Sequence, residues 1–277
     1  MSGENVRREK LNEEPVTLDS KAAGFAVPER LYKYRALDVR TLSALATNRL
    51  FFVDYKLFND PFDCQAVRDL DSEAQERLRE WTAEFDALDR FRVCPLSAVR
   101  DDVLMWGHYG DSHRGFCLEF RPKNDRTFRE MCFPVIYQPD YPDLNASGPS
   151  PDGIPHPLLR LLMTKSEQWS YESEWRMVLQ IESDEQLPSA TSFEYDPHVL
   201  TGIIFGLRMP EEHKHLIRLI TASFPHRRYY QAVRDEASYA IKIEPAEPSE
   251  PAATSRARKT PRSPNAAARV DSKHESG

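Results

Sequence analysis

The sequence predicts an α+β domain with a mixed, largely antiparallel sheet and flanking helices. Segments typical of strands outnumber those typical of helices, and the two kinds do not alternate strictly along the chain, as a doubly wound parallel sheet would require. With 277 residues, 40% of them hydrophobic, the chain suits one domain with a substantial core better than two small ones. We therefore expect a single sheet-based domain.

Composition divides the chain into three expected parts. Residues 1–27 form a polar, flexible leader, residues 28–243 the domain, and residues 244–277 a disordered basic tail rich in Pro, Ala and Ser. The tail holds too few apolar side chains to offset the entropy lost on ordering. From Ala252 onward it carries six Lys or Arg against two Asp or Glu, so the rest of the chain has a net charge of −11 within a total of −7.

Apolar runs rich in aromatic and β-branched residues predict the strands. In chain order, strands are expected at 31–35, 49–53, 91–96, 115–120, 133–137, 176–181, 200–205, 228–233 and 239–243.

Amphipathic spacing and capping residues predict the helices. They are expected after the N-cap Asp38, over 71–90, over 104–109, from about 157 to 167, and after Pro210. Two loops stand between these elements. Asn59, Asp60 and Pro61 predict a turn within 58–63, and the Pro/Gly/Ser-rich stretch 139–157 predicts a long surface loop that is a candidate lid.

Composition and motifs exclude several classes of protein. The acidic body argues against an extensive nucleic-acid footprint, so nucleic acid is a secondary hypothesis. No apolar run approaches the ~20 residues of a membrane span and the N-terminus lacks a secretory core, so a cytoplasmic location is expected. No Walker-type loop, Gly-x-Gly-x-x-Gly or Gly-x-Ser-x-Gly occurs. The four widely spaced cysteines are expected to be reduced core thiols.

The run from Trp169 to Arg176 is the strongest candidate site. Its alternation predicts a strand with Glu172, Glu174 and Arg176 on one face and aromatic side chains on the other. Two carboxylates and a guanidinium are unfavourable to bury unless they are paired or line a wet cleft. The alternative is an exposed face on which Glu174 and Arg176 form a surface pair. An exposed catalytic Glu174 would tolerate substitution with little loss of stability.

Two histidines and two aromatics form a second group of candidates. His108 and His113 lack the register of a His-Glu-x-x-His helix, so we expect structural or substrate-contacting roles and no metal. Trp106 and Tyr109 lie three residues apart on a predicted helical turn, where they would form either an aromatic wall or core packing.

Three further charged residues have two interpretations each. Asp60 and Asp63 could bind a cation or act as a base, but turn and cap roles explain them more simply. Arg35 ends an aromatic-flanked strand, where it would form either a structural ion pair or a clamp for a phosphate or carboxylate.

Several motifs in their order resemble a bacterial family, domain of unknown function 2971 (DUF2971), over roughly residues 28–230. They are Leu31–Arg35, Phe58–Asp63, Trp106–Tyr109, His113–Gly115 and Trp169–Arg176.

A more distant resemblance is to ADP-ribosyltransferases, which implies a split mixed sheet and NAD as substrate. It implies that Lys33 or Arg35 on the first strand contacts the phosphates or ribose of NAD, and that Tyr109 stacks on nicotinamide. It also implies a late catalytic carboxylate, with Glu174 preferred to Glu172. No Ser-Thr-Ser strand motif is present, and Lys33 stands where one branch has a histidine. The resulting candidates are Glu174, Glu172 and Arg176 for catalysis, and Lys33, Arg35, Tyr109, His108 and Trp106 for NAD binding.

Three functions are carried forward. The first is an NAD-consuming ADP-ribosyltransferase-like enzyme or glycohydrolase, needing no metal, in phage defence or a toxin system. The second is a non-enzymatic sensor or adaptor that binds a nucleotide or a partner protein. The third is a metal-dependent nuclease, for which Asp60, Asp63, His108 and Glu119 would have to converge in space.

Overall fold

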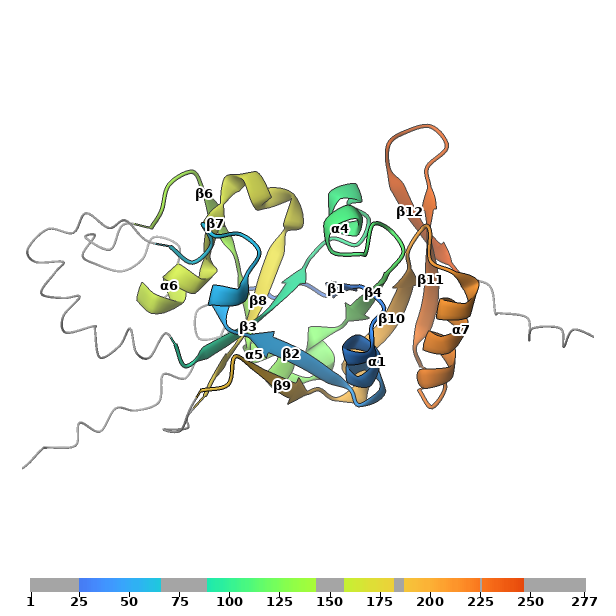
Figure 1. Cartoon of the computed structure of the whole chain (residues 1–277), viewed down its shortest axis with the longest axis horizontal. Coiled ribbons are helices and arrows are strands. Elements are labelled where there is room, and N and C mark those ends of the chain that lie inside the picture. The colour runs from blue at the N-terminus through green and yellow to red at the C-terminus, as the bar shows by residue number, and fades with distance from the viewer. Residues whose placement is uncertain (1–24, 66–88, 143–156, 182–186, 225, 247–277) are drawn as a thin grey trace, which may run out of the picture. The chain divides into compact units, whose positions relative to one another are not determined.

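A computed structural model describes residues 25–65, 89–142, 157–181, 187–224 and 226–246 (Figure 1). These residues belong to one compact unit of the chain, Met1–Glu247. Residues 71–88 of the expected helix over 71–90, most of the loop 139–157, the leader up to residue 24 and the tail beyond residue 246 lie outside the described residues.

The described residues form a large mixed sheet in which most neighbouring strands are antiparallel. In chain order its strands are β1 (Leu31–Arg35), β2 (Arg49–Val53), β3 (Phe91–Ser97), β4 (Phe116–Phe120), β5 (Cys132–Pro134), β8 (Glu174–Gln180), β9 (Ala190–Glu194), β10 (Leu200–Phe205), β11 (Arg228–Arg234) and β12 (Ile241–Pro245). The strand order is β12-β11-β10-β4-β1-β3-β2-β9, and β8 pairs with β3 and β5. Only β10 and β11 run parallel in this sheet. A separate parallel pair joins β6 (Ile136–Gln138) to β7 (Thr164–Ser166). The predicted α+β class with a largely antiparallel sheet is therefore confirmed.

The sheet is divided between β1 and β3. β1 pairs with β4 along all its residues, but it meets β3 at one register position, Tyr32 opposite Ser97. β3 in turn pairs with β8 along its whole length. Pro95 lies in β3 two residues before this junction and has no N–H with which to continue a ladder. Instead, the Lys33 ammonium donates to the Pro95 carbonyl across the gap. Two wings of the sheet thus diverge from Tyr32 and Ser97.

Helices within the described ranges are few and short. They are α1 (Val39–Ala46), α4 (Val103–His108), α5 (Arg126–Glu130), α6 (Pro157–Met163) and α7 (Glu211–Ile220), with short 3₁₀ turns η1 (Tyr55–Leu57), η2 (Pro122–Asn124), η3 (Glu167–Glu172) and η4 (Pro197–Val199). The Asp38 carboxylate caps α1 by accepting from the Thr41 N–H, as its position predicted. The Asp102 carboxylate caps α4 in the same way.

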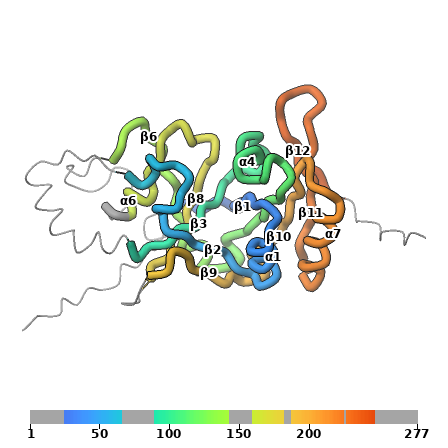
Figure 2. Tube along the Cα trace, viewed as in Figure 1, coloured from blue at the N-terminus to red at the C-terminus, as the bar shows by residue number. Residues whose placement is uncertain are grey.

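Figure 2 shows α4 beside β1. A hydrophobic cluster that joins α4 to β1, β4 and β10 holds it there. Its buried members are Tyr32, Tyr34, Met105, Trp106, Cys117, Ile204, Ala232 and Ile241. Each large apolar side chain buried here contributes about 1.5–3 kcal/mol. This packing holds α4, and the turn that follows it, beside the place where the wings diverge.

Two local predictions are wrong, and both concern the site. The run 169–176 is not a continuous strand, because η3 occupies residues 167–172 and β8 begins only at Glu174. Between them Ser173 is left-handed (φ 43°, ψ 51°), and its N–H donates to the Ser170 carbonyl. The helix expected from 157 to 167 ends at Met163, and the next three residues, Thr164–Ser166, form β7. The 3₁₀ turn η3 thus replaces the first part of the expected strand, and the pairing of β7 with β6 replaces the last part of the expected helix.

Other differences from the prediction are small. The expected strand at 133–137 is divided between β5 and β6, and the strand expected at 239–243 begins at residue 241. β9 and α5 were not predicted. All four cysteines are free and buried, as expected. No helix in the described part of the chain has the length and apolar character that a membrane crossing would need.

Candidate functional site

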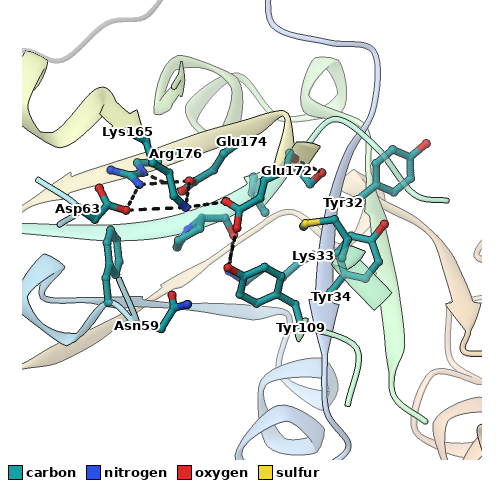
Figure 3. A pocket seen from close by; sticks show the side chains of 15 residues that line it. Tyr32, Lys33, Tyr34, Asn59, Asp63, Tyr109, Lys165, Glu172, Glu174 and Arg176 are labelled. Carbon is teal, nitrogen blue, oxygen red and sulfur yellow. Dashed lines mark hydrogen bonds and ion pairs between the residues drawn. The ribbon is translucent and has the colours of Figure 1, made fainter. Parts of the chain in front are cut away.

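A cavity of about 90 Å³ opens where the wings of the sheet diverge (Figure 3). Its walls come from both sides of the gap, from α4 and from the segments around η3. The lining residues are Tyr32, Lys33, Tyr34, Phe58, Asn59, Asp63, Pro95, Leu96, Ser97, Met105, Tyr109, Lys165, Glu172, Glu174 and Arg176.

The bend at Ser173 delivers two glutamates to this cavity. The Ser97 hydroxyl donates to the Glu172 carbonyl at 2.6 Å, and the Ala98 N–H donates to the Ser173 carbonyl at 2.9 Å. The Glu174 N–H donates to the Tyr137 hydroxyl at 2.7 Å. These bonds tie the bend to β3 on one side and to β6 on the other. Glu172 and Glu174 therefore converge although they do not share a strand face.

Glu174 is a buried carboxylate held by two cations. Arg176 donates from Nε to Oε1 at 2.7 Å and from Nη2 to Oε2 at 3.2 Å, and Lys165 Nζ donates to Oε2 at 2.9 Å. Burial by itself raises the pKa of Glu174, but the charges and hydrogen bonds of these two cations outweigh it and lower the pKa to about 2. Glu174 is 4% exposed, so the expectation of an exposed Glu174 in a surface pair is wrong.

Arg176 links Glu174 to a third carboxylate. Its guanidinium is completely buried, and Nη2 donates to Asp63 Oδ2 at 2.6 Å. Nη1 donates to the Leu162 carbonyl. Burial lowers the pKa of Arg176, but the carboxylates of Glu174 and Asp63 raise it well above its usual value. Asp63 is therefore an ion-pair partner, and the expected turn or cap role for it is wrong.

Glu172 has a different environment from Glu174. The Tyr109 hydroxyl donates to Oε1 at 2.6 Å, and Lys165 Nζ donates to Oε2 at 2.6 Å. Burial raises the pKa of Glu172 and the Glu174 charge raises it further, while Lys165 and the two hydrogen bonds oppose them in part. The net direction is upward. Neighbouring carboxyls with pKa values shifted in opposite directions are a recurrent feature of acid-base sites.

Lys33 and Asn59 complete the polar lining. Burial, and to a smaller extent Arg35, lower the pKa of Lys33, while Cys94, Glu174 and Glu172 act in the opposite direction; the net pKa is about 8. The exposed Asn59 contacts the Tyr109 hydroxyl with its side chain. The cavity thus brings together the three buried acidic side chains Asp63, Glu172 and Glu174, the two buried cations Lys165 and Arg176, and Lys33 with its lowered pKa.

Five of the predicted site residues meet at this cavity: Lys33, Tyr109, Glu172, Glu174 and Arg176. The other three do not line it. Trp106 is completely buried, its indole N–H donates to the Arg100 carbonyl at 2.9 Å, and its ring packs edge-on against Tyr34. The side chain of His108, which precedes Tyr109 in the chain, is exposed. Arg35 lies at the far end of β1, where its side chain is partly buried.

The convergence that a nuclease would require does not occur among the residues with described positions. Asp60 caps the turn by accepting from the Phe62 N–H, as expected, while Asp63 is held by Arg176. Glu119 lies on β4 with Tyr32 and Thr201 as hydrogen-bond partners. Within the described ranges, no group of three or more His, Cys, Asp or Glu could hold a metal ion.

Lys165 is the main site residue that the sequence analysis missed. It joins Glu172 to Glu174 and lies 5.1 Å from the centroid of the Trp169 ring. The sequence signal that could have found it is Thr164-Lys165-Ser166, because a β-branched residue and a serine there favour an end to the apolar helical run.

Comparison with known families agrees with the motif resemblance. Residues 105–177 match DUF2971, a protein family of unknown function. The match agrees with the resemblance to this family within residues 105–177. The DUF2971 segment contains Tyr109, Lys165, Glu172, Glu174 and Arg176, whereas Lys33 and Asp63 lie before it. No match was found among curated proteins or among solved structures.

Proposed function

We propose that this protein cleaves the bond between nicotinamide and ribose in NAD, with Glu172 as the catalytic carboxylate. The observation that supports it most is the contrast between the two glutamates of the cavity. Glu174 is held ionised by Arg176 and Lys165, whereas Glu172 has a raised pKa and one hydrogen bond on each oxygen. Sequence similarity favoured Glu174, but the contacts favour Glu172 for catalysis and Glu174 for positioning.

The chemistry suits a buried carboxylate. When the bond between the anomeric carbon and the nicotinamide nitrogen breaks, its electron pair neutralises the pyridinium ring and the ribose gains oxocarbenium character. A carboxylate beside that carbon stabilises the developing positive charge, and the low polarity of the site strengthens the attraction. Water or an acceptor nucleophile then adds to the carbon and loses a proton. Hydrolysis yields nicotinamide, ADP-ribose and one proton.

The raised pKa of Glu172 suits it to receive that proton. A carboxylate is a better general base when its pKa moves from its ordinary value toward neutrality. Tyr109 lines the cavity beside Glu172, so its ring is available for stacking on nicotinamide and its hydroxyl orients Glu172. Lys33 lines the same cavity and supplies a positive charge for a phosphate or a ribose hydroxyl.

The remaining charges hold this arrangement in place. Lys165 bridges Glu172 and Glu174, and Arg176 ties Glu174 to Asp63. Lys165, Glu174, Arg176 and Asp63 are therefore positioning residues, which fix the direction of the Glu172 carboxylate. At about 90 Å³ the cavity is smaller than the ~300–1,000 Å³ typical of small-molecule sites, so NAD would also occupy surface beyond it.

The test is nicotinamide release, followed by mass spectrometry after incubation of the purified chain with NAD. We expect release by wild type, and a loss of about 100-fold or more in Glu172→Gln. Glu167→Gln is the matched control, because Glu167 is an exposed glutamate on the same 3₁₀ turn. Release that persists in Glu172→Gln would refute the assignment of this residue.

A second candidate function is a binding module that recognises a nucleotide without turning it over. It is favoured by the fact that both Glu172 oxygens already have partners without a ligand, as in a purely structural ion cluster. Its signature is a rise in thermal midpoint with NAD and no nicotinamide release. Absence of both release and thermal shift would argue against both functions.

A further inference from the structure

A second buried carboxylate lies beside the cavity. Glu119 of β4 is 3% exposed and faces Tyr32 across the β1–β4 ladder. Its Oε2 accepts from the Tyr32 hydroxyl at 3.5 Å, and its Oε1 accepts from the Thr201 hydroxyl at 3.1 Å. Two guanidiniums approach the same carboxylate, with Arg30 Nε 3.8 Å from Oε1 and Arg100 Nη1 3.7 Å from Oε2.

The two arginines are only loosely engaged by Glu119. Both distances exceed those of normal charge-assisted hydrogen bonds, which are about 2.7–2.9 Å. Arg30 Nε is buried and has no hydrogen-bond acceptor among the described residues, although Arg30 also contacts the Tyr32 hydroxyl. The two side chains remain 37% and 32% exposed, so part of each guanidinium faces solvent. Donors are therefore left for an external acceptor.

Tyr32 connects this arginine pair to the cavity. It is one of the residues that line the cavity, and its hydroxyl contacts Glu119. Tyr32 is also the residue at which β1 meets β3, opposite Ser97. Arg30 immediately precedes β1, and Arg100 follows Ser97 by three residues, so both arginines flank the junction of the wings. The Arg100 backbone is fixed, since its carbonyl accepts from the Trp106 indole.

We propose that Arg30 and Arg100 form the diphosphate subsite of the cavity. This inference rests on the proposed function, because it assigns the part of a dinucleotide that extends beyond the ribose held at Glu172. With Glu119 between them the cluster carries a net charge of +1 on its solvent side. Planar guanidiniums bind phosphate oxygens through two parallel N–H donors, and two of them match the two phosphates of a diphosphate.

Glu119 serves as the inner anchor of the subsite. Its carboxylate accepts hydrogen bonds from the Tyr32 and Thr201 hydroxyls. It attracts the two guanidiniums by its charge, at distances longer than those of hydrogen bonds. A Cβ at position 202 would lie 3.3 Å from Glu119 Oε1, so Gly202 leaves room for the carboxylate. The arginines are consequently held close together, where their mutual repulsion is offset by Glu119 and can be offset further by an anion.

The test is calorimetric titration with ADP-ribose and, separately, with inorganic pyrophosphate, neither of which requires turnover. We expect wild type to bind both, with affinity that falls as salt rises. Arg30→Gln and Arg100→Gln should each weaken binding about tenfold, and the double variant more, as expected for lost charge-assisted hydrogen bonds. Arg49→Gln is the control, because Arg49 is an exposed arginine in a surface pair with Glu194 on the outer strands.

A variant that retains the positive charge separates loss of binding from loss of the fold. Arg100→Lys leaves Glu119 with the same neighbouring charge but removes the two-pronged donor, so it should lower affinity while its thermal midpoint stays near that of wild type. If nicotinamide is released, the Arg100→Lys change should raise KM for NAD about tenfold with kcat little changed, and should leave turnover of nicotinamide riboside, which has no phosphate, unaffected.

The outcomes separate this inference from the proposed function. Binding of pyrophosphate and ADP-ribose that depends on the two arginines supports the subsite, whether or not nicotinamide is released. Failure of wild type to bind either probe, or equal binding by the double variant, overturns it even if NAD is cleaved. Absence of nicotinamide release alone argues against the proposed function and leaves the binding result to decide the subsite.

Discussion

Replacement of Glu174 by glutamine should destabilise the domain by about 3–5 kcal/mol, which is the usual effect of removing one partner from a buried ion pair. The glutamine keeps the size of the side chain but removes its charge. Arg176 would then retain only the Asp63 carboxylate, and Lys165 would retain hydrogen bonding to the Glu172 carboxylate alone. Both cations would stay buried in an environment with one negative charge fewer.

The titration of Glu174 gives an independent magnitude. Its cations lower the pKa from its ordinary value of 4.5 to about 2, which corresponds to about 3 kcal/mol of stability. Because the folded pKa is the lower one, this stability is fully present above pH 4.5 and is lost as the pH falls from 4.5 toward 2. The difference between wild type and Glu174→Gln should therefore be large at pH 7 and should shrink across that window.

The assay is urea unfolding at pH 7 and at several acidic pH values, with thermal unfolding in parallel. A change of 3–5 kcal/mol should lower the midpoint by roughly 6–20 °C in a domain of this size. Glu167→Gln is the control, and as an exposed substitution it should stay within about 0.5 kcal/mol of wild type. A Glu174→Gln variant as stable as this control would refute the account of the ion network.

Three further predictions follow from the same contacts. Asp63→Asn should cost about 2–4 kcal/mol in urea unfolding, because it removes a buried charge bonded to Arg176, whereas Asp60→Asn at the exposed turn should cost less than 1 kcal/mol. Tyr109→Phe removes a hydrogen bond that lowers the pKa of Glu172, so the acidic limb of any pH–rate profile should move to higher pH, and an unmoved limb would count against Glu172 as the base. The pKa of Lys33 is about 8 in the folded chain against 10.5 ordinarily, so wild type should gain stability relative to Lys33→Met as pH rises from 8 to 10.5; parallel curves would contradict this.

The fold was largely predictable because its strands carry strong local signals. β1, β2 and β10 begin and end where the apolar and aromatic runs predicted, and Asp38 caps the following helix through a purely local hydrogen bond. The divergence between β1 and β3 leaves no such local signal. It depends on which strands become neighbours, and that is decided by tertiary contacts among residues far apart in the chain.

The site was predictable in its residues but not in its geometry. The spacing of Glu172 and Glu174 suggested a shared strand face, yet the two converge because Ser173 adopts a left-handed conformation after a 3₁₀ turn. Lys165 was missed because a helical period was extended past Met163. The burial of Asp63 against Arg176, which is 113 residues away in the chain, leaves no trace in local sequence. Trp106 is the opposite case: it belongs to a motif and was a candidate for the site, but its side chain is buried and its indole bonds to the Arg100 carbonyl.

The most direct test of the central claim is the initial rate of nicotinamide release at pH 7 and saturating NAD, measured for wild type, Glu172→Gln and Glu167→Gln at matched folded fractions. The account predicts release by wild type and by the Glu167→Gln control, with a loss of about 100-fold or more in Glu172→Gln. Equal release by all three variants, or none by wild type, would contradict the assignment of Glu172 as the carboxylate that cleaves NAD.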